Sequence, residues 1–192
     1  AHCGLHPAVF CGGGGGGSGS SGGGRGLVGL RRGRGARRTQ RLLSCGRENI
    51  RFWRVSRRHL PGCPAESSVN EYARGLEFTD LEFEASMKNQ TSLATDSAVK
   101  VVFVASSAGT LLQVNYSNRQ VLGLLRLHES AITCVLATEG YIVTGASDGL
   151  LRLWPLDFSD YLMQAQHDSP VASVAVSDDD LKLAVSTGSG PS

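Results

Sequence analysis

The stretch Thr144-Gly145-Ala146-Ser147-Asp148-Gly149-Leu150-Leu151-Arg152-Leu153-Trp154 decides the fold. It runs from a short apolar segment through a turn of small and polar residues into an alternating segment that ends in tryptophan. The segment Leu43–Trp53 has the same plan, and Ala105–Val114 repeats it with valine in place of the tryptophan. Apolar and polar alternation on both sides of a short turn predicts two antiparallel strands. The chain therefore repeats a β-hairpin.

Two independent landmarks give the period of this repeat. Val114 and Trp154 are 40 residues apart, and His128 precedes His167 by 39 residues. A period of about 40 residues is typical of units that each contain four strands. The agreement between two different landmarks makes a chance match a poor explanation.

One spacing departs from the period. Trp53 lies 61 residues before Val114, which indicates an insertion of about 20 residues relative to a repeat of about 40. The polar stretch Glu84–Ser97 is expected to form part of this inserted loop, because it interrupts the alternation seen elsewhere.

Residues 42–192 are predicted to be all-β. Ile132, Cys134 and Leu136 alternate with small or polar residues, and no segment shows a sustained helical period. Short strands with a turn about every 8–12 residues fit four-stranded sheets arranged radially. The sequence predicts about three such sheets and a truncated fourth.

These residues resemble the WD-repeat family of β-propellers. In that family a histidine between blades, a Ser or Thr on the second strand, an Asp in the next turn and the Trp form a hydrogen-bonded structural tetrad. The matching residues here are His128, Thr144, Asp148 and Trp154, with Trp53 and His167 as further landmarks. A buried indole N–H and a buried imidazole need such partners. The resemblance implies a partial WD40 β-propeller, although Arg54, Asn115 and Pro155 replace the Asp that usually follows the tryptophan.

Four stretches resemble, more specifically, a large centriolar and ciliary member of this family. They are Ser44–Val55, Leu60–Pro64, Glu77–Glu84 and Gly149–Ser159. The resemblance implies a non-catalytic scaffold that supports cilium assembly and binds centriolar or microtubule-associated proteins. It also implies a cytoplasmic location in the cytoskeleton, at the centriole or ciliary basal body. The alternative is an adaptor in another WD assembly, such as a ubiquitin-ligase receptor or an RNA-processing complex.

Residues 1–41 differ in composition from the rest of the chain. They hold 15 of the 25 glycines and seven arginines but no acidic residue, whereas residues 42–192 carry a net charge of −5. Glycine is costly to order and few large apolar residues are present, so this segment is predicted to be disordered. Its arginines could contact nucleic acid or the acidic tails of tubulin. Translated non-coding sequence is the other explanation, and the lack of aromatic residues between Arg25 and Arg41 disfavours nucleic acid.

No catalytic, cofactor or metal site is predicted. His167, Asp168 and Ser169 are of triad type, but neighbours in sequence cannot adopt the geometry of a triad. The run Asp178–Asp180 lacks the Gly and the distant Glu of a calcium loop and reads as a solvated turn. No small-molecule substrate is expected, and no apolar run is long enough to span a membrane. Five scattered cysteines indicate a reducing compartment.

Overall fold

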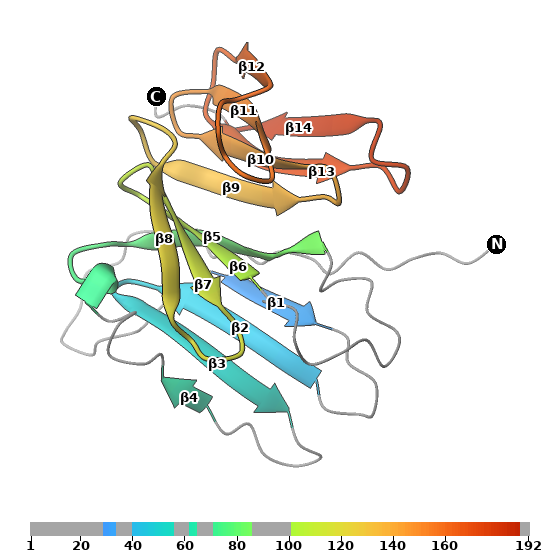
Figure 1. Cartoon of the computed structure of the whole chain (residues 1–192). Coiled ribbons are helices and arrows are strands. Elements are labelled where there is room, and N and C mark those ends of the chain that lie inside the picture. Colours follow the sequence, from blue (N-terminus) through green and yellow to red (C-terminus); the bar gives the residue numbers. More distant parts are fainter. Residues whose placement is uncertain (1–28, 34–39, 56–61, 65–70, 86–100, 189–192) are drawn as a thin grey trace.

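The computed structural model describes residues 29–33, 40–55, 62–64, 71–85 and 101–188. These residues form three antiparallel sheets of four strands and one sheet of two, and within each sheet every strand pairs with its neighbour in sequence (Figure 1). We call the sheets blades 1 to 4. Blade 1 contains β1 (Gly29–Gly33), β2 (Gln40–Gly46), β3 (Asn49–Val55) and β4 (Gly62–Pro64); blade 2 contains β5 (Phe78–Phe83), β6 (Val101–Ser106), β7 (Thr110–Asn115) and β8 (Val121–Arg126). Blade 3 contains β9 (Ile132–Ala137), β10 (Tyr141–Ala146), β11 (Leu150–Pro155) and β12 (Met163–Gln166); blade 4 contains β13 (Val171–Val176) and β14 (Leu183–Thr187). The predicted fold class, three four-stranded units followed by two strands of another, is confirmed.

The first strands of successive blades lie side by side. β5 contacts β1 and β9, and β9 contacts β13. Thr79 Oγ1 donates to the Ile132 carbonyl at 2.5 Å, and Thr133 Oγ1 donates to the Val171 carbonyl at 2.5 Å. The same residue position therefore fastens each blade to the next, from blade 2 to blade 4.

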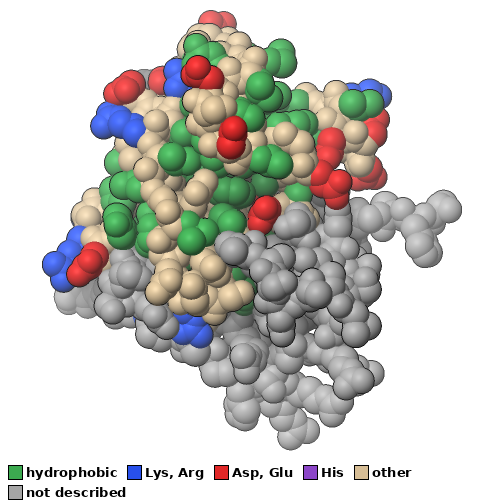
Figure 2. Space-filling view, in the orientation of Figure 1, with side chains coloured by type: hydrophobic (Ala, Val, Ile, Leu, Met, Phe, Trp, Pro, Cys, Tyr) green, Lys and Arg blue, Asp and Glu red, His purple; other side chains and the backbone are tan. Residues whose placement is uncertain are grey.

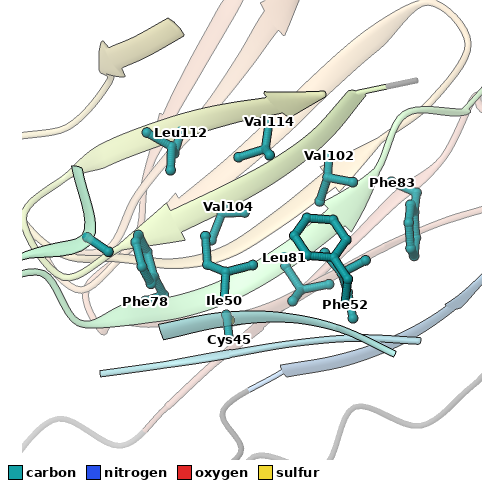
Figure 3. Packing of buried hydrophobic residues seen from close by; sticks show 12 residues of the cluster. Cys45, Ile50, Phe52, Phe78, Leu81, Phe83, Val102, Val104, Leu112 and Val114 are labelled. Atoms are coloured by element: carbon teal, nitrogen blue, oxygen red, sulfur yellow. The ribbon is translucent and has the colours of Figure 1, made fainter. Parts of the chain in front are cut away.

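The hydrophobic core lies between the blades rather than within one of them. The first cluster joins blades 1 and 2 and includes Leu43. Figure 3 shows its members Phe52, Phe78 and Leu112. A second cluster around Trp154 joins blades 2 and 3, and a smaller third cluster joins blade 3 to β13 and β14. Because each strand presents alternate side chains to the two neighbouring blades, both faces of blade 2 are apolar. Stacking of repeats thus creates the core.

The inserted loop lies where its composition predicts it. β5 ends at Phe83 and β6 begins at Val101, whereas the corresponding connection in blade 3 runs only from Ala137 to Tyr141. Residues 86–100 of this connection lie outside the described residues. The insertion leaves the strand order of blade 2 unchanged.

The register of blade 1 corrects the alignment of the first hairpin with the third. Ser44 lies opposite Arg51 in the β2–β3 pair, as Thr144 lies opposite Arg152 in the β10–β11 pair. Ser44, rather than Leu43, is therefore the counterpart of Thr144. The turn between β2 and β3 is one residue shorter than the turn between β10 and β11. An alignment of Trp53 with Trp154 that contains no gap does not reveal this difference.

Strand β1 lies within the segment for which the composition predicts disorder. Gly29–Gly33 pairs with β2 from Gly29 opposite Cys45 to Gly33 opposite Arg41. The prediction differs from the structure at these residues, because backbone hydrogen bonds along an open strand edge require few apolar side chains. Residues 1–28 and 34–39 lie outside the described residues.

Two glycines occupy equivalent turns between the second and third strands of blades 2 and 3. Gly109 has a φ of 75° and Gly149 a φ of 84°. A Cβ atom on Gly149 would lie 2.2 Å from the His167 carbonyl oxygen, and one on Gly109 would lie 2.1 Å from the His128 carbonyl oxygen. Each glycine therefore lets a turn pack against the connection that enters the next blade.

We expect Gly149→Ala to lower the free energy of unfolding by about 2 kcal/mol or more, since a left-handed alanine alone costs about 1–2 kcal/mol and the clashing atoms belong to the backbone. Gly140→Ala is the matched control, because nothing lies within 4 Å of its added Cβ. Urea denaturation of the two variants measures the difference. Equal midpoints for both variants would contradict the close approach at Gly149.

Candidate functional site

A buried hydrogen-bond network joins three strands or connections of blade 3. His128 lies in the connection before β9, Thr144 on β10 and Trp154 on β11, and their exposed fractions are 1%, 0% and 7%. Trp154 Nε1 donates to Thr144 Oγ1 at 2.8 Å, and Thr144 Oγ1 lies 2.7 Å from His128 Nε2. The network holds the chain that enters blade 3 against the blade's second and third strands.

The hydroxyl of Thr144 bridges the indole and the imidazole. It accepts the indole proton of Trp154 and has both a proton and a second lone pair with which to bond His128 Nε2. Nδ1 is buried and has no hydrogen-bond partner among the described residues.

Asp148 does not join this network. It is exposed, and its Oδ1 accepts the Leu150 N–H at 3.0 Å within the β10–β11 turn. The family resemblance implied a bond between Asp148 and His128. The structure lacks this bond, because a short acidic side chain readily satisfies its own turn. Three of the four residues predicted for the tetrad are brought together.

Arg152 on β11 links the third strand of blade 3 to the connection that precedes β9. Its Nη1 donates to the Leu127 carbonyl, and its Nε donates to Gln164 Oε1 at 3.0 Å. Its guanidinium also lies 5.9 Å from the centre of the Trp154 ring. Arg152 is not among the residues predicted from the sequence, although Arg51 repeats it opposite Ser44 in blade 1 and provides a signal.

The environment of His128 disfavours its charged form. Burial lowers its pKa from 6.5 to about 4, and the positive charge of Arg152 acts in the same direction, while Asp148 opposes both. The folded pKa therefore lies below the unfolded value, so the unfolded chain binds a proton more readily. The free energy of unfolding that neutral His128 contributes is fully present above pH 6.5 and is lost as the pH falls toward 4.

We expect this protonation to cost about 3 kcal/mol of unfolding free energy by pH 4, because each pKa unit corresponds to about 1.4 kcal/mol. Denaturation curves of the wild-type chain and of His128→Gln, recorded from pH 7 to pH 4, measure the difference in slope. The variant should lose less stability over this range. Identical pH dependence in the two proteins would show that His128 does not titrate as described.

The remaining landmarks are only partly equivalent to this network. His167 is the counterpart of His128 in blade 4, but the residue that corresponds to Thr144 there is a valine. Val185 lies opposite Val174 in blade 4, as Thr144 lies opposite Val135 in blade 3. Valine offers no hydroxyl, and the buried Nε2 of His167 has no hydrogen-bond partner among the described residues. The side chain of Trp53 lies outside the described residues, while its backbone pairs with Leu42 in β2.

Sequence reasoning missed the polar contacts between the first strands. Besides the bonds from Thr79 and Thr133, the Val135 N–H donates to Asp80 Oδ2 at 3.0 Å across blades 2 and 3. A signal was present, since Thr follows the first apolar residue of the strand in both Phe78-Thr79 and Ile132-Thr133. These bonds satisfy backbone groups that face a neighbouring blade.

The described part of the chain shows no cluster of three or more His, Cys, Asp or Glu residues able to hold a metal ion. Among the same residues, no helix has the length and apolar character needed to cross a bilayer. The described residues form stacked antiparallel sheets whose strands are joined by turns and connections.

Residues 119–155, which run from the end of blade 2 through β11 of blade 3, match the family described as WD domain, G-beta repeat. A chain of the solved structure titled Crystal Structure of Mitotic Checkpoint Complex superposes with a TM-score of 0.56 at 13% identity, over 76% of this chain and 40% of that one. This likeness concerns the fold alone. The chain is a member of the WD-repeat family, whose proteins are generally non-catalytic scaffolds that bind other proteins.

Within that family the chain is similar to particular curated proteins. It is 38% identical to centriole proteome protein 16 of Chlamydomonas reinhardtii over 161 residues, and 34% and 31% identical to WD repeat-containing protein 90 of Xenopus tropicalis and Homo sapiens over 169 residues. Each match covers 78% of this chain. The chain spans only 8–9% of the length of these relatives.

Proposed function

We propose that the chain is an interaction module of a centriole- and cilium-associated scaffold protein, linked to microtubules and needed for cilium assembly, and that it catalyses no reaction. The observation that supports this is the identity of 31–38% over 78% of the chain with centriole proteome protein 16 and WD repeat-containing protein 90. A shared location is a property of whole proteins, so the proposal concerns the protein to which these blades belong.

The architecture supports a scaffold role for a physical reason. The buried polar groups of blade 3, His128, Thr144 and Trp154, hydrogen-bond to one another in the interior. Turns and connections between the strands are exposed, as are the outer strand β12 and parts of β13 and β14, and the stacked sheets hold them in place. Rigid sheets that carry exposed loops suit docking of proteins.

The location is tested by tagging the protein at its own locus and imaging it with a marker of the centriole wall. We expect the tag to coincide with the centriole and basal body, and depletion to reduce the number of ciliated cells. Rescue with the wild-type protein is the positive control. A diffuse nuclear signal would contradict the proposal, as would co-purification with ubiquitin-ligase or RNA-processing subunits in place of centriolar proteins.

A further inference from the structure

The connection between β11 and β12, together with the first residue of β12, exposes a group of apolar side chains. Leu156, Tyr161, Leu162 and Met163 are 50%, 47%, 62% and 64% exposed. β12 is the outermost strand of its sheet, so these side chains lie at the outer edge of blade 3. In Figure 2 hydrophobic and acidic side chains lie next to one another in the upper part of the molecule, where Figure 1 places β11 and β12. We call residues 156–163 the edge loop.

The edge loop is fixed at both ends. Near its end, the Leu162 N–H donates to the Leu153 carbonyl at 2.7 Å. The Phe158 N–H donates to the Pro155 carbonyl at 3.0 Å, and Phe158 adopts a φ of 55°, which a bulky residue rarely does. This conformation places the Phe158 ring 5.8 Å from the Phe103 ring of blade 2 and 6.3 Å from the Trp154 ring of blade 3. One aromatic side chain thus anchors the loop to two blades.

Further contacts order the rest of the loop. Asp157 Oδ1 accepts both the N–H and the hydroxyl of Ser159, at 3.1 Å and 2.9 Å. The Tyr161 ring lies 5.9 Å from the Trp154 ring and 5.2 Å from the Arg152 guanidinium. A surface that is already ordered loses little conformational entropy on binding. The backbone that carries the exposed apolar side chains is therefore held in place.

Both charged side chains within the edge loop are acidic. The neighbouring Arg152 packs its guanidinium against the Tyr161 ring and donates to Gln164 Oε1 and to the Leu127 carbonyl. Asp157 and Asp160 are exposed within the edge loop itself. The hydrogen bonds from Ser159 lower the pKa of Asp157, so its carboxylate is charged at neutral pH. An acidic partner would be repelled, and a basic one attracted.

We propose that the edge loop is a docking site for a short segment of a partner protein that carries an apolar anchor residue flanked by lysine or arginine. The apolar side chains would cover the anchor, and Asp157 and Asp160 would pair with its basic neighbours. A second copy of this chain is a poor occupant, because two identical edge loops would bring these aspartates together. The inference rests on the proposed interaction role but not on the centriolar location.

Three synthetic peptides of equal length test the proposal by fluorescence anisotropy with the full chain. The first combines leucine with lysine, the second leucine with glutamate, and the third serine with lysine. We expect the leucine–lysine peptide to bind at least about tenfold more tightly than either of the others, and its binding to weaken as salt screens the charges. Equal binding of the serine–lysine peptide would reduce the site to charge alone and overturn the proposal. Equal binding of the leucine–glutamate peptide would overturn it as unspecific adhesion.

Variants place the binding on the edge loop. Leu162→Ser/Met163→Ser and Asp157→Asn/Asp160→Asn should each weaken binding of the leucine–lysine peptide about tenfold. Asp168→Asn/Asp178→Asn changes the charge by the same amount outside the loop and should leave binding within twofold of wild type. Unchanged affinity of both loop variants would overturn the proposal. So would a wild-type dimer in sedimentation velocity that Leu162→Ser/Met163→Ser dissociates, since the occupant would then be a second copy.

Failure of the peptide test and failure of the proposed function are distinguishable. Loss of peptide binding with centriolar localisation intact would remove the edge loop as a docking site and leave the proposed function standing. Peptide binding by a protein that does not localise to the centriole would support the edge loop as a docking site and contradict the proposed function.

Discussion

Trp154→Ala is expected to lower the free energy of unfolding by about 3–5 kcal/mol, the usual cost of removing a large buried aromatic side chain. The indole packs in the cluster that joins blades 2 and 3, and its exposed fraction is 7%. Its removal also takes the hydrogen-bond donor from Thr144. Chemical denaturation monitored by circular dichroism measures the loss.

Two comparisons divide this effect into its parts. Trp154→Phe keeps most of the packing but removes the indole N–H, so it should cost about 1–3 kcal/mol, the range for stranding a buried partner. Leu181→Ala, at a side chain that is 82% exposed, should change stability by less than about 0.5 kcal/mol. If Trp154→Ala were as harmless as Leu181→Ala, the tryptophan would not be buried between the blades.

Thr144→Val is the second change with a large expected effect. Valine has nearly the same shape but removes the hydroxyl that bonds both His128 Nε2 and Trp154 Nε1. Two buried polar groups lose their partner at once, at about 1–3 kcal/mol each, so we expect a total loss of about 2–6 kcal/mol. Thr187→Val on the exposed part of β14 is the control for the loss of a hydroxyl from a strand.

A double variant separates the hydrogen bonds from packing around Thr144. His128→Phe should cost less in the Thr144→Val background than in the wild-type chain, because the imidazole has already lost its partner. A coupling energy near zero, measured by denaturation of the four proteins, would show that His128 and Thr144 contribute independently.

The repeat made most of the fold predictable. The recurrence of Val114 and Trp154, and of His128 and His167, fixes the period, and alternation within each period fixes the strands. Both signals survive in a single sequence because each blade must bury side chains on both faces. The division of the chain into three four-stranded sheets and a two-stranded one followed from them.

Other features depend on geometry that spacing does not encode. Asp148 stands at the expected place in the turn, but the rotation of its side chain toward the Leu150 N–H is decided locally. The counterpart of Thr144 in blade 1 is Ser44, which only strand register reveals, because the turn there is one residue shorter. Strand β1 was missed because its glycine- and arginine-rich sequence lacks the alternation of apolar and polar residues that predicts a strand.

The most direct test of the account is whether the first strands of successive blades lie side by side. Nuclear Overhauser contacts between Thr79 and Ile132, and between Thr133 and Val171, report this arrangement across 53 and 38 residues of sequence. We predict that both contacts are observed, together with the contact between Thr144 and Arg152 within blade 3. Presence of the Thr144–Arg152 contact without either of the other two would mean that the hairpins form but do not stack as blades, and would contradict the account.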